Sequence, residues 1–215
     1  MARLICLANS WRPGGRCVAG IDMATGKWVR PIPRQRGAVP EEYTWLDDSY
    51  LGPLDIVEMQ LEAPTFRTRF QCENCVVRNW DWRRLGRATV ADVLKYCVKE
   101  EIVLHSTSKT VEPAQVERLP PQDWASLALV HVENVLFDRD PHEAVRWHAK
   151  FSLGRLGPRY RIKLTDPDAT RRLNKGQPIK PACLLTLSLT EPIMMPDHPE
   201  LCYKLVAGVI ELGDV

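Results

Sequence analysis

The cysteine pair Cys72-x-x-Cys75 has the spacing at which two thiolates bind one metal ion. A structural zinc site needs four ligands, usually as two close pairs, and the sequence has neither a second Cys-x-x-Cys nor a His-x-x-x-His. His142 and His148 lie in the other half of the chain. A redox pair is not favoured either, because such a motif belongs at the start of a helix and this one lies among expected strands. Cys72 and Cys75 are therefore weak candidate metal ligands, and no cofactor is predicted.

Motifs for covalent or phosphate chemistry are missing from the sequence. It contains no nucleophile elbow, no phosphate-cradling glycine loop and no His-Glu-x-x-His. Gly14-Gly15 indicates a tight turn between strands, without the following helix whose dipole would hold a phosphate. Enzymatic activity therefore has no positive support, and an enzyme is the least favoured class of protein.

Aromatic residues interleaved with arginine are the more informative pattern. Bases of single-stranded nucleic acid stack on aromatic faces while Arg and Lys follow the phosphates. The alternative is that the tryptophans fill small barrel cores and the arginines lie along the outside. Trp80 and Trp82 alternate and so share a face, which favours their segment. The interleaved segments are Trp11-Arg12, Trp28-Val29-Arg30, Trp80-Asp81-Trp82-Arg83-Arg84 and Arg159-Tyr160-Arg161.

The basic residues are concentrated in two segments. The whole chain carries a net charge of only +2. Residues 1–36 hold seven basic residues and one acidic residue, and residues 66–87 hold six basic and two acidic residues. An acidic stretch between 41 and 62 separates them. The two basic segments predict either an anion-binding face formed where they meet, or a solvated surface rich in arginine.

Length and composition predict a globular protein outside membranes. The chain has 215 residues and is 45% apolar, and no apolar run approaches the roughly 18 residues that a membrane helix needs. Only six residues follow Met1-Ala2-Arg3 before Ser10, which is too short for the apolar core of a signal peptide. The seven cysteines make an odd number. We therefore expect a cytoplasmic protein with reduced thiols.

The first half of the chain predicts short strands and one clear helix. A short helical turn is expected near 41–46, and the Thr89 and Asp92 spacing of a capping box begins a helix over 89–98. Three prolines between 113 and 121 predict the domain boundary. The first domain is accordingly expected over 1–115. Its strands are expected at 3–8, 16–22, 27–32, 55–61 and 75–80.

The second half, 122–215, predicts three strands, a helix and two strands. Asp166-Pro167-Asp168 is a strong helix start, with Asp as the N-cap and Pro in the first turn, and Gly176 follows the helix end near Asn174. This is the element order of an OB barrel. The strands are expected at 127–137, 144–153, 159–164, 183–189 and 203–212.

Several segments resemble the dual OB-containing domain family of bacteria. The opening is the most specific: residues 4–10, residues 15–20 and Trp28-Val29-Arg30-Pro31. Shorter similarities follow at Glu73-Asn74, 160–167 and 203–207. The resemblance implies a mainly β protein of two tandem OB-like β-barrels with a few short helices. It also implies a role in bacterial conflict or anti-phage systems, where the domain is thought to recognise nucleic acid or nucleotides.

The resemblance assigns no catalytic residues. Its signature positions fall on Asn9, Ser10, Arg16, Trp28 and Arg30, which either contact a ligand or fix a strand crossing. Cys72 and Cys75 lie outside that pattern, which weakens the zinc interpretation further.

The favoured hypothesis is a non-enzymatic nucleic-acid-binding module for single strands or unpaired ends. The first barrel would carry the binding surface, and the second would support it. A sensor of a small nucleotide or modified base, with Trp28 and Arg30 lining its pocket, and an adaptor that docks a partner protein are the alternatives. The candidate ligand-binding residues are Asn9, Ser10, Arg16, Trp28, Arg30, Trp80, Trp82, Arg83 and Arg84.

Overall fold

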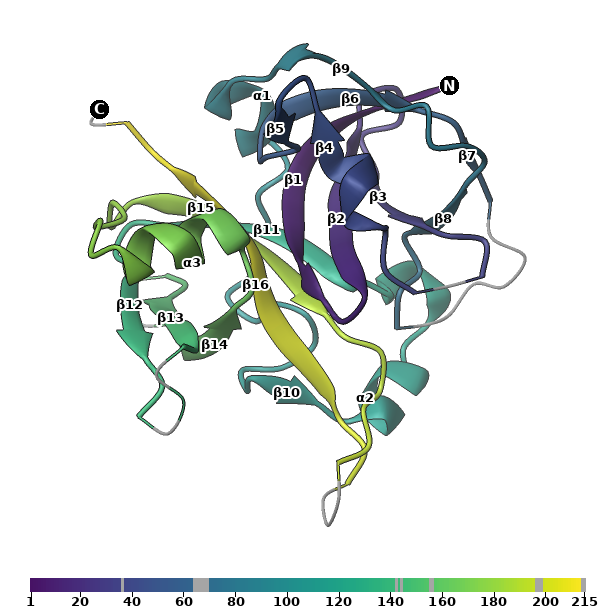
Figure 1. Ribbon diagram of the computed structural model, residues 1–215. Helices are drawn as coiled ribbons and strands as arrows, with labels where there is room; N and C mark the ends of the chain where they lie inside the picture. The colour runs from purple at the N-terminus through teal and green to yellow at the C-terminus, as the bar shows by residue number, and fades with distance from the viewer. Residues whose placement is uncertain are drawn as a thin grey trace. The chain divides into compact units, whose positions relative to one another are not determined.

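Two compact units make up the chain in a computed structural model (Figure 1). The first unit comprises Met1–Arg67 and Glu73–Tyr96, and the second comprises Thr68–Cys72 and Cys97–Val215. Both are mainly β, as the sequence predicts. The structure describes residues 1–35, 37–63, 70–141, 143, 145–154, 157–195 and 199–213.

The first unit is a sheet with the strand order β7-β8-β3-β2-β1-β6-β9. A short 3-10 helix, η1 (Glu41–Thr44), and a two-stranded hairpin follow β3, and the helix α1 (Val90–Leu94) follows the last strand. The strands are β1 (Ala2–Arg12), β2 (Gly15–Asp22), β3 (Trp28–Ile32), β4 (Trp45–Leu46), β5 (Ser49–Tyr50), β6 (Asp55–Met59), β7 (Leu61–Glu62), β8 (Asn74–Val77) and β9 (Arg83–Arg87).

The sheet of the first unit curls back on itself into a barrel. Only Gln60 separates β6 from β7, yet β6 pairs with β1 while β7 pairs with β8. Since β8 also pairs in parallel with β3, the path β1-β2-β3-β8-β7-β6 returns to β1. This is the closed strand order of an OB barrel. Its core includes Leu4, Cys6, Val18, Val29, Val57, Met59 and Trp82.

The second unit forms a barrel of the same topology. Its strand order is β11-β15-β16-β14-β13-β12, and β14 pairs in parallel with β16. Because β11 and β12 follow each other along the chain, their succession closes the ring. The elements are β10 (Thr110–Val111), α2 (Pro113–Glu117), η2 (Pro121–Asp123), β11 (Leu127–Val132), β12 (Leu136–Arg139), β13 (Trp147–Ser152), β14 (Arg159–Leu164), α3 (Pro167–Asn174), β15 (Cys183–Leu189) and β16 (Cys202–Glu211).

The helix α3 begins where the sequence predicts. The Asp166 carboxylate accepts hydrogen bonds from the backbone N–H groups of Asp168 and Ala169, at 2.9 and 3.0 Å. Its second oxygen accepts from the Val209 N–H at 2.9 Å, which ties the helix start to β16. Burial raises the pKa of Asp166 to about 6. One side chain therefore caps the helix and anchors it to the sheet.

The helix α1 confirms its capping box and corrects the predicted length. Thr89 and Asp92 exchange both hydrogen bonds of the box. The helix nevertheless ends at Leu94, not at the predicted residue 98. Cys97 and Val98 have left the helix, because Cys97 forms a β-bridge with Leu129 and the Val98 N–H donates to the Leu129 carbonyl. Strand pairing therefore replaces the last turn.

One predicted strand of the second half is two strands. The segment 127–137 divides into β11 and β12, because β11 pairs with β15 and β12 pairs with β13. Between them the Val135 N–H donates to the Pro181 carbonyl. The predicted strand 144–153 is β13 from Trp147 onward, and its first predicted residue, Ala144, lies outside the described residues.

The compact units divide earlier than the prolines suggest. Val103, Leu104, Val111 and Val116 lie in the core of the second unit, although they precede residue 122. The buried Lys204 ammonium also donates to the Val103 and Ser106 carbonyls. The segment 97–121 therefore packs with the second unit.

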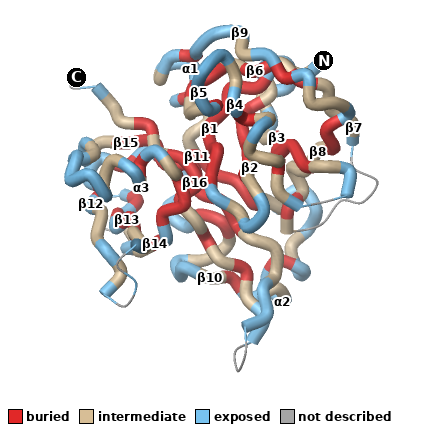
Figure 2. The backbone as a smooth tube through the Cα atoms, in the orientation of Figure 1, coloured by how far each residue is buried: buried red, intermediate tan, exposed pale blue. Residues whose placement is uncertain are grey.

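Burial in the first unit follows the central strands (Figure 2). From Leu4 to Ser10 every residue of β1 is buried, which matches the apolar run expected there.

The strand β9 was not predicted, because Arg83-Arg84-Leu85-Gly86-Arg87 lacks an apolar alternation. Its pairing with β6 comes from tertiary contact alone.

Among the described residues, no helix is long and apolar enough to cross a membrane.

Candidate functional site

Arg16 is the centre of a polar and aromatic cluster in the first unit. Its side chain is only 3% exposed. Its guanidinium lies 4.1 Å from the ring centroid of Trp11 and 4.9 Å from that of Tyr50. One terminal nitrogen contacts Glu41 Oε1 at 2.5 Å. Its Nε and Nη1 find no hydrogen-bond partner among the described residues. Arg16 therefore holds two aromatic rings in place.

Two turns bring these residues together. The β1–β2 hairpin places Trp11 directly opposite Arg16. Arg16 and Val39 exchange both backbone hydrogen bonds, at 2.8 and 2.9 Å. Gly15 is required here, because its φ is +151° and a Cβ would lie 2.3 Å from the Val39 carbonyl oxygen. The chain entering η1 is therefore fixed against the start of β2, and Glu41 meets Arg16.

A tight hairpin supplies the remaining aromatic residues. The strands β4 and β5 are joined by Asp47 and Asp48, whose φ values are +49° and +64°. Aspartate tolerates this left-handed conformation, and such turns match the twist of a hairpin. Trp45 and Tyr50 face each other across it, with ring centroids 4.7 Å apart and planes 85° apart. The hairpin thus presents an edge-to-face aromatic pair.

The exposed aromatic side chains of the described chain all lie in this region. Trp11 is 52% exposed, Trp45 50% and Tyr50 38%. We call these three residues the aromatic cluster. A large aromatic side chain buries roughly 150–250 Å² when it is packed. Three such side chains exposed together therefore leave apolar surface in contact with water. Such a surface is suited to stacking a flat ligand.

The charge of Arg16 is balanced within the cluster. The hydrogen bond from Arg16 lowers the pKa of Glu41, against the opposing effect of burial, and a hydrogen bond from Tyr50 lowers it further. Glu41 is therefore a carboxylate at neutral pH. The pair positions Trp11 and Tyr50, while phosphate contacts need other cations.

Asn9 and Ser10 are buried beside this cluster on β1. The Asn9 amide donates to the Leu51 carbonyl at 2.7 Å, immediately after β5. The Ser10 hydroxyl donates to the Cys17 carbonyl at 3.5 Å. Asn9 thus fixes the end of the β4–β5 hairpin. The prediction that both residues touch a ligand stays a prediction.

Trp28 and Arg30 lie toward the other end of β2 from Arg16. Trp28 pairs with Ile21 and is half-buried, and Arg30 is fully buried. The Arg30 guanidinium contacts Asn74 Oδ1 at 3.5 Å, and its backbone N–H donates to the Glu73 carbonyl. These contacts join β3 to the parallel strand β8. A ligand contact of Trp28 or Arg30 stays a prediction.

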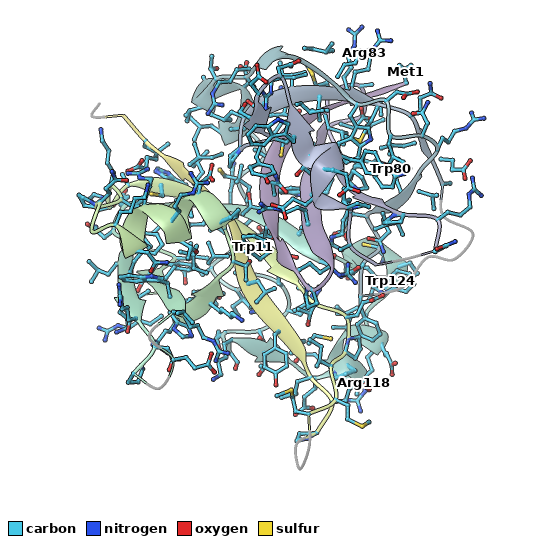
Figure 3. All side chains as sticks on the ribbon, viewed as in Figure 1. Met1, Trp11, Trp80, Arg83, Arg118 and Trp124 are labelled. Atoms are coloured by element: carbon cyan, nitrogen blue, oxygen red, sulfur yellow. The ribbon has the colours of Figure 1, made fainter. Side chains whose placement is uncertain are left out.

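Trp80 and Trp82 differ in exposure. Trp80 lies beside η1 (Figure 3) and stacks on Tyr43, with ring centroids 4.5 Å apart and planes 10° apart. Trp82 is buried in the barrel core. The Trp82 backbone N–H donates to the Trp80 carbonyl, so the chain turns here. The two rings are nevertheless neighbours, with centroids 5.8 Å apart and planes 43° apart.

The arginines after Trp82 have different surroundings. Arg83 extends away from the barrel into solvent (Figure 3). Arg84 contacts Asp55 at 3.3 Å and donates to the Ser49 and Tyr50 carbonyls. Arg84 therefore stabilises the β4–β5 hairpin through its strand β5. Arg36, Arg67 and Arg69 of the two basic segments lie outside the described residues.

Cys72 and Cys75 belong to different compact units. The Cys72 thiol donates to the Trp124 carbonyl at 3.3 Å, and Cys75 lies on β8 opposite Pro31. His142 lies outside the described residues. In the described part of the chain, no group of three or more His, Cys, Asp or Glu residues could hold a metal ion.

The two compact units are both barrels of OB topology. The family model of the dual OB-containing domain matches residues 2–209. The chain belongs to this family. Searches of curated proteins and of solved structures found no match. The family shows the fold of this dual-OB protein.

Sequence reasoning missed Glu41, Trp45 and Tyr50 as site residues. The segment Trp45-Leu46-Asp47-Asp48-Ser49-Tyr50 did carry a signal. Two aromatic residues flank a four-residue stretch with Asp-Asp at its centre, which is compatible with a hairpin turn. The partnership with Arg16 had no signal, because it joins residues far apart in the sequence.

Proposed function

We propose that this dual-OB protein is a non-enzymatic module that binds single-stranded nucleic acid through its aromatic cluster. The observation that carries the proposal is the exposure of Trp11, Trp45 and Tyr50 around the buried Arg16. A stacked base contributes about 1–3 kcal/mol, and stacking accepts every base. Two or three stacked bases would therefore give useful affinity without base-specific hydrogen bonds.

We also propose a bacterial setting, from the resemblance of the sequence to bacterial dual OB-containing domains. We infer that the protein acts in the cytoplasm, where its seven free thiols stay reduced, and within a bacterial conflict or anti-phage system. Unpaired strands or ends are the ligand class that suits such a role, since stacking on the aromatic cluster requires bases that are not already stacked in a duplex.

A titration with a labelled single-stranded oligonucleotide tests the proposal. Trp11→Ala combined with Trp45→Ala should weaken binding by at least tenfold, because each lost stack removes about 1–3 kcal/mol. Trp11→Phe combined with Trp45→Phe is the matched control, since it keeps an aromatic face at both positions. Equal affinities of the alanine variant and the wild type would contradict the proposal.

Docking of a partner protein is the second candidate, and the same exposed cluster favours it. An exposed apolar patch is a common mark of a protein interface. That function predicts no affinity for any oligonucleotide. A third outcome, saturable binding of a mononucleotide that does not strengthen with oligonucleotide length, would instead indicate a nucleotide sensor.

A further inference from the structure

The outer surface of β13 and β14 in the second unit carries regularly spaced cations. Along these two strands, the side chains that point inward belong to the barrel core: Ala149, Phe151, Tyr160, Ile162 and Leu164. Because side chains alternate across a strand, the intervening residues face outward. The outward residues are His148, Lys150 and Ser152 on β13, and Arg159, Arg161 and Lys163 on β14.

The strand register sets these cations in two adjacent rows. Directly opposed pairs are His148 with Lys163, Lys150 with Arg161, and Ser152 with Arg159. Opposed Cβ atoms lie about 5 Å apart, and successive outward residues of one strand about 7 Å apart. We call Lys150, Arg159, Arg161 and Lys163 the basic face.

Like charges directly opposed on a sheet are destabilising. One carboxylate moderates the repulsion: Asp138 of β12 lies 2.9 Å from Lys150 Nζ and 3.2 Å from Arg161 Nη2. Burial alone would raise the pKa of Asp138, but the hydrogen bonds from Lys150 and Arg161 lower it below its ordinary value. Asp140 lies beside His148, and Glu143 pairs with Arg146 and acts on Lys163. With Arg146 included, five cations against the three carboxylates leave a formal excess of two positive charges.

Two of the outward residues have a lowered pKa. Burial lowers the pKa of His148, and the charge of Arg161 lowers it further. The pKa of Lys163 is lowered by partial burial and then by the charge of Arg146. Burial is the larger cause of both shifts; the arginine charges add to it, and the carboxylates Asp140, Asp138 and Glu143 oppose it.

We propose that the basic face binds the phosphate backbone of a single-stranded nucleic acid. It is a second contact, on a different unit from the aromatic cluster. Rows of cations at regular spacing are complementary to a linear polyanion. The outward side chains of β13 and β14 are all polar or charged, so they offer phosphate contacts and no apolar insertion into a membrane. The contact would supply affinity without sequence preference.

Removing two cations tests the basic face in the full-length protein. The experiment measures the affinity of Lys150→Gln combined with Lys163→Gln for a labelled single-stranded oligonucleotide across a salt series. The slope of log K against log salt should become shallower by about 1.4, because each lost phosphate contact removes about 0.7 on a single strand. Lys99→Gln combined with Lys109→Gln removes two exposed lysines of the same unit that lie outside β12–β14 and should leave the slope unchanged. A slope equal to that of the wild type would overturn the proposal.

A gain of affinity provides the complementary test, because misfolding cannot produce it. Asp138→Asn removes the carboxylate that occupies Lys150 and Arg161, so the variant should bind the oligonucleotide several-fold more tightly at low salt. Unchanged or weaker binding would count against the basic face.

Two further readouts separate the possible sources of the result. Phosphatidylserine vesicles that bind in a Lys150- and Lys163-dependent manner, with no such dependence for the oligonucleotide, would indicate a membrane surface and overturn the proposal. The aromatic double variant should lose affinity while keeping its salt slope. If the aromatic double variant bound as tightly as the wild type while the lysine double variant still had a shallower salt slope, the stacking proposal would be wrong and the basic-face proposal would stand.

Discussion

The guanidinium of Arg16 lies over the rings of both Trp11 and Tyr50 while Glu41 balances its charge. The sequence identified Arg16 and Trp11 as residues with possible chemistry, and the structure assigns Arg16 to positioning Trp11. A planar guanidinium can stack on two rings, whereas an ammonium cannot. Burial of Arg16 and exposure of Trp11 depend on contacts across the fold, so the sequence pattern alone could not separate these two roles.

Arg16→Lys tests this arrangement at the residue scale. The variant keeps the charge and loses the stacking, so the free energy of unfolding should fall by about 1–2 kcal/mol. Urea denaturation measures the change. Arg83→Lys, at an exposed position of the same unit, should stay within about 0.5 kcal/mol of the wild type. Equal stability of the two variants would show that Arg16 does not organise the rings.

His148 gives a pH dependence at the same scale. Burial and then Arg161 lower its pKa in the folded protein below the ordinary 6.5. The unfolded chain therefore binds the proton more readily, so folding stability is complete above pH 6.5 and decreases as the pH falls through that value. In denaturation series, His148→Gln should lose stability less steeply than the wild type between about pH 7 and 5. A steeper loss in the variant would contradict the assignment.

At the scale of elements, local signals predicted the parts that local chemistry determines. The start of α3, the Thr89–Asp92 capping box and the strands of the second barrel follow from caps, turns and alternation. The end of α1, the break between β11 and β12, and the strand β9 depend on pairing with distant segments. Sequence periodicity carries no information about those partners, and these elements were therefore misjudged.

Asp166 tests how an element is anchored. Asp166→Ala removes two helix-capping hydrogen bonds and the bond to Val209, so it should cost about 2 kcal/mol of folding free energy. Asp166→Asn should cost less, because asparagine is also a good N-cap. Thermal and urea denaturation measure both. Equal costs for the two variants would show that hydrogen bonding at this position is not what holds α3.

At the scale of the whole molecule, the chain contains two barrels of one topology with different surfaces. The first presents the aromatic cluster, and the second presents the basic face. The sequence assigned binding to the first half, because its arginines are concentrated there, and treated the second half as support. Strand register changes this view of the second half, since it places lysines and arginines from two strands on one face.

Binding of the full-length chain to matched single- and double-stranded oligonucleotides, at about 50 and 200 mM salt, tests the central claim most directly. We expect the single strand to bind more tightly than the duplex, because stacking on the aromatic cluster needs free bases. Its affinity should fall steeply with salt if the basic face contacts phosphates as proposed. No binding to either oligonucleotide, or an affinity that salt does not change, would contradict the account.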